Sequence, residues 1–557
     1  MYPCRSISVL SLMLLSTCLH AEALPAGVKH ALADERIGLL DTGKLKLTTG
    51  KCGDCASSRQ ALWYFQDDLI AASTSAALVA GVSPQLDRND DVRQWAVTPA
   101  SRELASPAVT WIGSPQIIGS ASIDSAGAAV TPAGGEAIAL SLAPKLSTNR
   151  SFANASTIAY FHQRPLRMRG AMTDKDGKPT FVARTIWPAD YAIDGARLAL
   201  QPLAGTGDLR DFVSDDSIGR DGKLASRLVW ERSPGAARQL AGKAVLGFML
   251  NGAQGDDDES IGGHFAIATG RFGAKGEWAD WAVNNFYNLD SVSEKGIIAA
   301  TLPMDNYLMD LNSGQQYYRP SYMLVAILSK DRTAVAYQGG VQRVMNHFYR
   351  HDLTYAHAAN NCAGISMDVF RALGWNVPRR GATDHVKALG AYAYISAKEA
   401  SLKKGRGIYD YLTEETTRLY PAVAFDAAGT DLLALVGATA SKSRVRTPYE
   451  RQLAQDVEAI ILVKIPQIPS SRAAGASPAF SFDEYQARVP ADQANWKIVP
   501  VGPRPFPDTL RDSGSAQPAA ASVVPLPVAF IGMAGLFGGG AIWRRRKKKS
   551  SAKPSSD

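Results

Sequence analysis

Cysteine is scarce in this 557-residue sequence. Five cysteines are present, and only Cys362 falls in the last five hundred residues. Outside the cytoplasm, a thiol with no disulfide partner in its own region is exposed to oxidation. We therefore expect Cys362 either to be buried and unreactive or to carry out chemistry.

Net charge is also nearly missing from the body of the chain. The formal net charge is +8, but six of those charges come from residues 544–549. The other charged residues at the two ends cancel, which leaves +2 for residues 24–543. A general affinity for nucleic acid, which the basic composition alone would suggest, is therefore not expected.

Long hydrophobic runs are missing except at the two ends. The first run, "ISVLSLMLLSTCL", follows Arg5 and precedes the small residues "AEA". This is the layout of a secretory signal peptide spanning residues 1–23, and the run is short for a membrane span. Cys18 offers a lipoprotein alternative, but Thr17 fits that motif poorly.

The second run lies at the C-terminus, in "VVPLPVAFIGMAGLFGGGAIWRRRKKK". Residues 523–543 are long enough to span a bilayer as a helix, and the cations that follow would hold its end in the cytoplasm. Residues 523–549 therefore predict a transmembrane helix whose N-terminal side faces outward.

This tail resembles the PEP-CTERM sorting signal of Gram-negative bacteria, in a variant with "VPLP". The motif residues are Val524, Pro525, Leu526 and Pro527, and the cationic end begins with Arg544, Arg545 and Arg546. The resemblance implies processing by an exosortase, after export by the secretion machinery. An inner-membrane-anchored precursor would then be delivered to the cell surface or extracellular matrix. An ordinary C-terminal anchor is the alternative, and both place the body outside the cytoplasm.

The chain between the ends has the composition of a folded globular protein, with 46% hydrophobic and 8% aromatic residues. No internal repeat stands out. Short β-like runs predict a β-rich domain over residues 24–240, and apolar strands followed by helical periodicity predict an α+β domain over 241–400. "DLLALVGA" and "YERQLAQDVEAIILVKI" predict a helical extension over 401–465. Pro, Ser, Ala and Gly predict a linker over 466–522.

Two short motifs resemble metal sites. "KCGDC" contains Cys52 and Cys55, but no second CxxC or histidine pair follows, so a short-loop disulfide is favoured over a redox pair or a zinc site. "GDDDES", residues 255–260, lacks the ligand spacing of a calcium loop, and a solvated loop is expected. We therefore predict no resident metal.

The surroundings of Cys362 predict a helix that begins at the thiol. "AANNC" supplies small polar residues, and "AGISMDVFRALGW" places apolar side chains on one helical face before Gly374 ends it. Unpaired N–H groups at a helix N-terminus stabilise an anion. This position is expected to lower the pKa of the thiol and to make Cys362 a nucleophile.

A nucleophilic cysteine needs a base, which is usually histidine. His264, in "IGGHFAIATGRF", begins a strand-like run and is the preferred candidate. The rivals are His347, His351, His357 and His385, of which His357 is the strongest. The cluster before Cys362 also leaves a metal site open as an alternative.

The order of these motifs resembles the circularly permuted papain-like hydrolases, relatives of the NlpC-type peptidases. A "GH" strand comes first, then a second strand in "WADWAVNNFYNLD", then an "NC" that opens a helix. The resemblance covers residues 244–376 and implies His264 as base and Cys362 as nucleophile. Asn285 would orient the imidazole, with Asn284 and Asp280 as rivals. The segment "GIIAATLPMDNYLMDLNSGQQYYRP" would be an insertion.

The resemblance implies a cysteine peptidase, amidase or acyltransferase that acts on an amide or ester without a cofactor. Its substrate would be a cell-wall or matrix polymer, a matrix protein or a lipid amide. Three alternatives stay open: an inactive relative of the fold, an unrelated buried thiol, and a non-enzymatic surface or biofilm-matrix protein whose N-terminal region binds a polymer.

Overall fold

The computed structural model describes residues 24–30, 37–39, 70–73, 85–102, 109–112, 114, 116–144, 153–203, 205, 207–215, 217, 222–286, 299–349, 353, 355, 360–440 and 444–497. The predicted signal peptide, the pair Cys52 and Cys55, and the C-terminal sorting signal lie outside these residues. Among the helices that are described, none combines the length and apolar character needed to cross a membrane.

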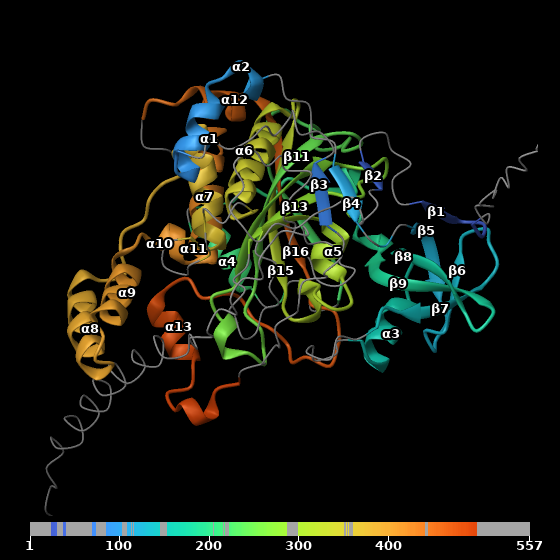
Figure 1. The fold of residues 1–557 in the computed structure, drawn as a ribbon. Coiled ribbons are helices and arrows are strands. Elements are labelled where there is room, and N and C mark those ends of the chain that lie inside the picture. Colours follow the sequence, from blue (N-terminus) through green and yellow to red (C-terminus); the bar gives the residue numbers. More distant parts are fainter. Residues whose placement is uncertain are drawn as a thin grey trace, which may run out of the picture.

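Five strands form a small closed sheet at one side of the molecule (Figure 1). They are β5 (Gln116–Ile123), β6 (Ala129–Pro132), β7 (Ile138–Leu142), β8 (Leu166–Lys175) and β9 (Lys178–Pro188), and pairing of β5 with β8 closes the barrel. A short strand, β1 (Val28–His30), extends the edge of β5. Asp176 and Gly177 join β8 to β9 with positive φ angles of 55° and 76°, the conformation of a tight hairpin turn.

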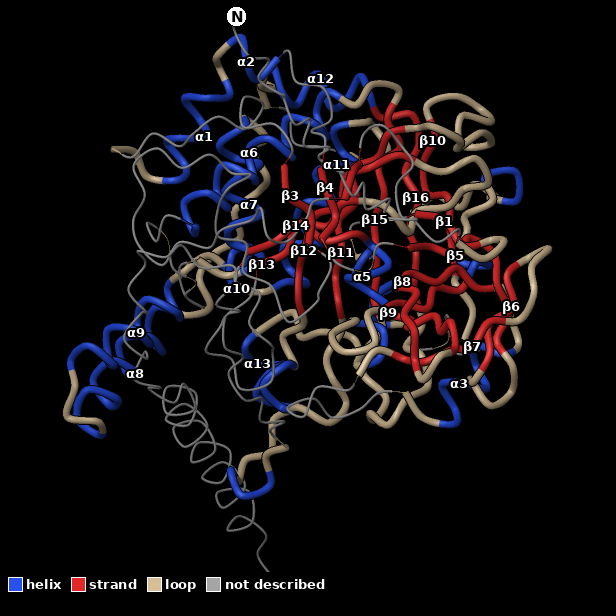
Figure 2. Tube along the Cα trace, turned by 45° about the vertical axis from the view of Figure 1, so that its right-hand side comes forward, coloured by secondary structure: helices blue, strands red, loops and turns tan. Residues whose placement is uncertain are grey.

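Ten further strands form one large sheet through the centre of the described chain (Figure 2). Their order is β10 (Ala225–Glu231), β16 (Val457–Ile465), β15 (Ser321–Leu328), β11 (Ala244–Asn251), β12 (His264–Arg271), β13 (Ala282–Phe286), β14 (Ala299–Pro303), β3 (Ile70–Ser73), β4 (Val109–Ile112) and β2 (Ile37–Leu39). Neighbours are antiparallel except β2 and β4. Every residue of β11 and β15 is buried, which explains their continuous apolar sequences, because both faces of the sheet are covered.

Helices cover one face of this sheet. They include α6 (Arg332–Tyr349), α7 (Cys362–Leu373) and α11 (Pro421–Leu435), with α1 (Arg88–Ala96), α2 (Pro99–Arg102), α10 (Thr416–Leu419) and α12 (Pro448–Asp456) around them. The Phe248 ring on β11 lies 5.7 Å from the ring of Phe370 on α7 and 5.8 Å from that of Trp375. This aromatic contact fixes α7 against β11, the strand that pairs with β12.

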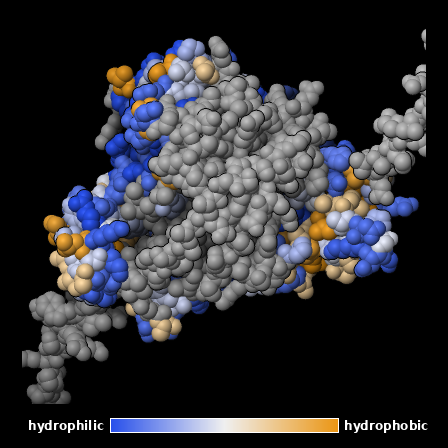
Figure 3. All heavy atoms as spheres, viewed as in Figure 1, coloured by the Kyte–Doolittle hydropathy of each residue, from blue (hydrophilic) through white to orange (hydrophobic). Residues whose placement is uncertain are grey.

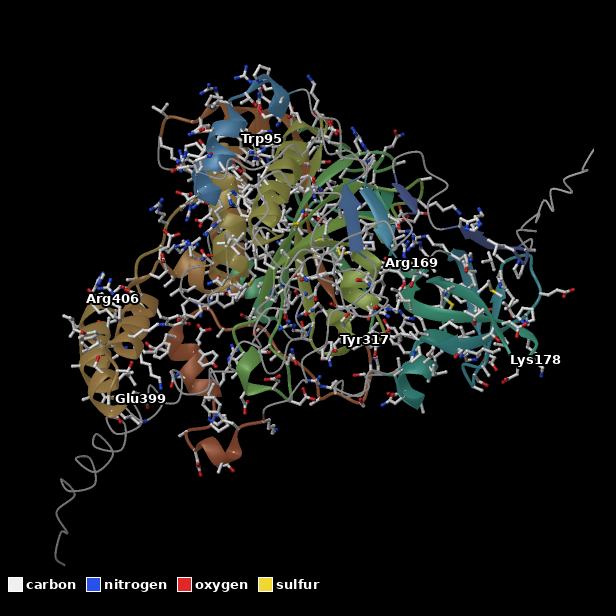
Figure 4. All side chains as sticks on the ribbon, viewed as in Figure 1. Trp95, Arg169, Lys178, Tyr317, Glu399 and Arg406 are labelled. Atoms are coloured by element: carbon white, nitrogen blue, oxygen red, sulfur yellow. The ribbon has the colours of Figure 1, made fainter. Side chains whose placement is uncertain are left out.

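The closed sheet and α5 (Met304–Met309) pack near the opposite face. Arg169 on β8 donates to Asp305 at 2.9 Å, and Arg167 donates to the same carboxylate at 2.6 Å. Figure 4 shows Arg169 where the closed sheet meets α5. Because Asp305 is fully buried, these ion pairs hold the two sheets in one body.

Two helices, α8 (His385–Lys398) and α9 (Leu402–Thr413), form a hairpin that projects from the sheet (Figure 1). The surface of this lobe includes exposed apolar side chains, among them Val386, Leu389 and Leu402. Hydrophobic atoms are visible there in Figure 3. The remaining helices are α3 (Ala155–His162), α4 (Asp208–Ser214) and α13 (Phe482–Arg488).

The predicted mixed α+β class is confirmed, but the structure corrects three expected assignments. The helix in "YERQLAQDVEAIILVKI" ends at Asp456, and the β-branched residues after it form β16 inside the large sheet. Residues 466–497 pack on the body and include α13, so the predicted linker cannot begin at residue 466. In addition, strands β2, β3, β4 and β10 of the predicted N-terminal domain belong to the large sheet.

Candidate active site

Three polar residues on neighbouring strands, Ser321, Asn251 and His264, form a polar row at one end of the large sheet. The backbone register pairs Asn251 with His264 and, on the other side, with Ser321. Gly263 precedes this row with a φ of 76°, and a side chain there would collide with the carbonyl oxygen of Asn251. Glycine is therefore required where the chain turns into β12, and this turn starts the strand at His264 as predicted.

His264 is held by Asn285, which lies on the neighbouring strand β13. The His264 Nε2 atom is 2.6 Å from the Asn285 Oδ1 atom, and both side chains are buried. An amide oxygen only accepts hydrogen bonds, so Nε2 carries the proton and Nδ1 is the basic nitrogen. Burial, assisted by the charge of Arg319, lowers the pKa of His264 to about 3, so the imidazole is neutral at pH 7.

The two rivals of Asn285 have structural partners instead. Asn284 and Gln338 exchange amide hydrogen bonds of 2.8 and 2.9 Å on the helix-covered side of the sheet. Asp280 accepts from Arg167 and Arg169 at 2.6 and 2.7 Å, among the ion pairs that join the two sheets. Strand alternation thus directs Asn284 and Asn285 to opposite faces, and only Asn285 contacts His264.

A buried network continues the polar row away from His264. Asn251 donates to Ser321 at 2.8 Å and accepts from the hydroxyl of Tyr307, whose ring centroid lies 6.4 Å from that of His264. Ser321 in turn donates to Gln316. These contacts fix Tyr307 beside the imidazole and restrict the positions that the ring can adopt.

Cys362 is the first residue of α7, as the sequence predicts. Asn361 caps the helix by accepting from the N–H of Gly364 at 2.8 Å, and Gly374 ends it with a φ of 104°. Helix α7 packs against β12, the strand that begins with His264. Cys362 is a free thiol with 5% of its surface exposed.

The expected lowering of the thiol pKa is wrong for this structure. Burial raises the pKa of Cys362 above its ordinary value. Four groups lower the pKa of the thiol without overcoming the effect of burial. They are the N–H of Phe265, the hydroxyl of Tyr355, the N–H of Ala363 and the charge of Arg319. The helix N-terminus therefore stabilises the thiolate, but not enough to ionise a thiol that is almost completely removed from water.

The Cys362 thiol contacts the backbone of β12 at the residue next to His264. Phe265, whose N–H acts on the thiol, directly follows His264. The Cys362 N–H donates to the hydroxyl of Tyr355 at 3.3 Å, which places a polar oxygen at the N-terminus of α7.

The other histidines are less suitable as a base. His347 is buried on α6, with its Nε2 atom 3.4 Å from the carboxylate of Asp91, and Asp91 also pairs with Arg343. His385 begins α8 on the projecting hairpin. His351 and His357 lie outside the described residues.

No group of three or more potential metal ligands occurs in the portion of the chain that is described. The acidic run 255–260 is partly packed rather than fully solvated, which corrects that prediction in part. Asp256 accepts from Arg472 at 2.5 Å, and Asp257 is almost fully buried. The reason is that residues 466–478 fold back over this loop, and a strand bridge joins Ala253 to Ala476.

Sequence reasoning did not identify Arg319, Tyr307 or Tyr355. Arg319 precedes the strand β15 in "YYRPSYMLV", and a lone cation before an apolar run is the only signal that it gives. Tyr307 lies within the segment interpreted as an insertion. Tyr355 stands seven positions before Cys362 and carries no motif.

Comparison with known proteins gives no relative for this chain. No protein-family model, no curated protein and no solved structure matches it. The candidate site is therefore defined by its own geometry: His264 oriented by Asn285 on adjacent strands, and Cys362 at the start of the helix packed on β12.

Proposed function

We propose that this protein is an exported thiol hydrolase or acyltransferase with a circularly permuted papain-like domain. The observation that carries the proposal is the buried contact between His264 and Asn285 at 2.6 Å, next to a helix that begins with Cys362. A histidine held by an amide oxygen through Nε2 presents Nδ1 as a base, and a free thiol at a helix N-terminus is a suitable nucleophile.

The reaction would begin from a neutral thiol and a neutral imidazole, the forms that burial favours. Nδ1 of His264 would accept the thiol proton as the sulfur of Cys362 bonds to the carbonyl carbon of an amide or ester. The resulting imidazolium would then protonate the leaving amine or alcohol, which leaves a thioester on the sulfur. Water or an acceptor nucleophile would cleave the thioester and regenerate the thiol.

The oxyanion formed in this step needs donors close to the sulfur. The Cys362 N–H is one candidate, and it now donates to the Tyr355 hydroxyl. A substrate carbonyl oxygen that replaced this hydroxyl would receive the same hydrogen bond. The thiol must also deliver its proton to the imidazole, and catalytic contacts commonly tighten when substrate binds.

The non-enzymatic alternative also has a specific observation in its favour. Cys362 and His264 are 5% and 4% exposed, and the pKa of each favours the uncharged form. A polymer-binding surface protein that inherited this fold without its activity would retain such a closed, neutral pair. The two functions differ in whether Cys362 forms a covalent intermediate.

The proposed location rests on the two ends of the sequence. The N-terminal signal and the "VPLP" tail would export the protein, anchor it in the inner membrane and pass it to an exosortase for delivery to the surface or matrix. Cell-wall peptides, matrix proteins and lipid amides would then be within reach as substrates.

Incubating the exported protein with these three substrate classes tests the proposed activity. Wild type should release an amine or alcohol, and Cys362→Ala should abolish the release. His347→Ala is the matched control, because it removes another buried histidine and should retain the activity if the protein stays folded. Equal product formation by wild type and Cys362→Ala would contradict the proposal and favour the binding function.

A further inference from the structure

Arg319 is a buried cation at the same end of the sheet as the candidate site. It lies just before β15 and is 1% exposed. Its Nε and Nη2 atoms donate to the side-chain oxygen of Gln315 at 2.9 and 2.7 Å, and Nη1 donates to the carbonyl of Gly252 at 3.3 Å. Gly252 follows Asn251, the strand partner of His264, so these contacts place the guanidinium next to the polar row.

The C-terminal segment over residues 466–478 encloses this arginine. Gly475 packs so closely that a Cβ atom there would lie 2.8 Å from the Cα of Arg319 and 2.5 Å from the carbonyl of Ala253. On the same segment, Arg472 pairs with Asp256 and lies 4.7 Å from the ring centroid of Tyr318. Arg319 is therefore held on several sides, and an arginine does not lose its proton in a protein.

We propose that Arg319 is a positioning residue for the Cys362–His264 pair: a fixed positive charge, held beside the polar row, that stabilises negative charge on the sulfur during the reaction. This inference rests on the proposed thiol chemistry. The hydrogen bonds of Arg319 to Gln315 and Gly252 hold the side chain in place, and the proposal adds a role for its charge.

Both members of the pair respond to this charge. Arg319 lowers the pKa of the Cys362 thiol and also lowers that of His264. Among the described residues, the Tyr355 hydroxyl and the N–H groups of Phe265 and Ala363 contact the thiol, and Arg319 adds a positive charge. Tyr307, which packs beside His264, donates its hydroxyl to Asn251.

The test is the pH dependence of Cys362 alkylation by iodoacetamide in the full chain, followed by peptide mass spectrometry. Arg319→Gln and Arg319→Met remove the charge, whereas Arg319→Lys keeps it. Arg343→Met is the matched control, because it removes another buried arginine, which pairs with Asp91 on α1. The neutral variants should raise the pH midpoint of Cys362 alkylation by about one unit and slow alkylation at neutral pH by about tenfold. Arg319→Lys and Arg343→Met should stay close to wild type.

The outcomes separate this inference from the proposed function. If His264→Ala changes the profile while both neutral variants of Arg319 match wild type, the positioning role is wrong and the thiol–imidazole pair stands. If neither His264→Ala nor the Arg319 variants change it, both are wrong. A variant that unfolds would expose the thiol and speed alkylation, opposite to the expected change. If one neutral variant of Arg319 unfolds, the other one is used. NMR of that variant should show a rise in the pKa of His264, and no rise would contradict the role of Arg319.

Discussion

His264 and Asn285 form a buried contact of 2.6 Å between adjacent strands, from the imidazole Nε2 atom to the amide Oδ1 atom. This one bond sets the chemistry available to the histidine. It assigns the proton to Nε2, leaves Nδ1 as the base, and fixes the ring against rotation. Asn285 differs in this contact from its sequence neighbour Asn284, whose side chain points to the helix-covered face of the sheet.

The first prediction concerns this tautomer. Nitrogen-15 NMR of His264 should show the Nε2-protonated form in wild type and a mixture in Asn285→Ala, because the variant removes the acceptor. The loss of one such bond should lower kcat/KM by about tenfold. Asn284→Ala is the matched control: it should lower stability by disrupting the pairing with Gln338, yet keep the tautomer. Nδ1 protonation in wild type would contradict the assignment.

A second prediction follows from the neutral state of His264. Its pKa falls from an ordinary 6.5 to about 3 in the folded protein, so the unfolded chain binds more protons between these values. The contribution to the free energy of unfolding is therefore complete above pH 6.5 and is lost as the pH falls, by about 1.4 kcal/mol per unit.

Urea unfolding of wild type and His264→Gln at several pH values between 4 and 7 measures this contribution. The glutamine variant does not titrate, so its stability should fall less steeply with acidification than that of wild type. Parallel curves would show that His264 is not buried in the neutral form.

The third prediction concerns the intrinsic reactivity of Cys362. Because burial raises its pKa, the alkylation midpoint of the folded protein should lie at a higher pH than that of the same thiol in urea. Iodoacetamide labelling of folded and unfolded protein, followed at the peptide containing Cys362, makes this comparison. If the alkylation midpoint of the folded protein lay below that of the unfolded protein, the thiol would be activated, as the helix N-terminus alone suggests.

A fourth prediction concerns the C-terminal tail. Residues 544–549 should hold the end of the predicted helix in the cytoplasm while a protease reaches "VPLP" from outside. Intact-mass analysis of surface protein from the native host should therefore show a mature chain without the helix, and neutral replacements at 544–549 should impair processing. A mature chain that retains residues 528–557 would identify a permanent anchor instead.

The sequence was most informative where local rules decide the structure. Cys362 begins its helix and Gly374 ends it, because a polar cap and a left-handed glycine are local signals. His264 begins its strand for a similar reason, since Gly263 makes the turn. In these places the prediction and the structure agree.

Long-range packing decided the features that the sequence did not reveal. The run "AIILVKI" looked like the continuation of a helix, but its place between β10 and β15 makes it a strand. The composition of residues 466–497 suggested a linker, yet close glycine contacts seal this segment over Arg319. The pKa of Cys362 was mispredicted for the same reason, because burial by distant segments outweighs the local effect of the helix N-terminus.

The most direct test of the account is transfer of an acyl group to Cys362 from a small activated ester, p-nitrophenyl acetate. Intact mass and peptide mapping would follow wild type, His264→Ala and the control His347→Ala at neutral pH. The account predicts an acetyl group on Cys362 that forms about 10²–10⁴-fold faster in wild type and the control than in His264→Ala. An unmodified Cys362, or equal acylation with and without the His264 imidazole, would contradict it.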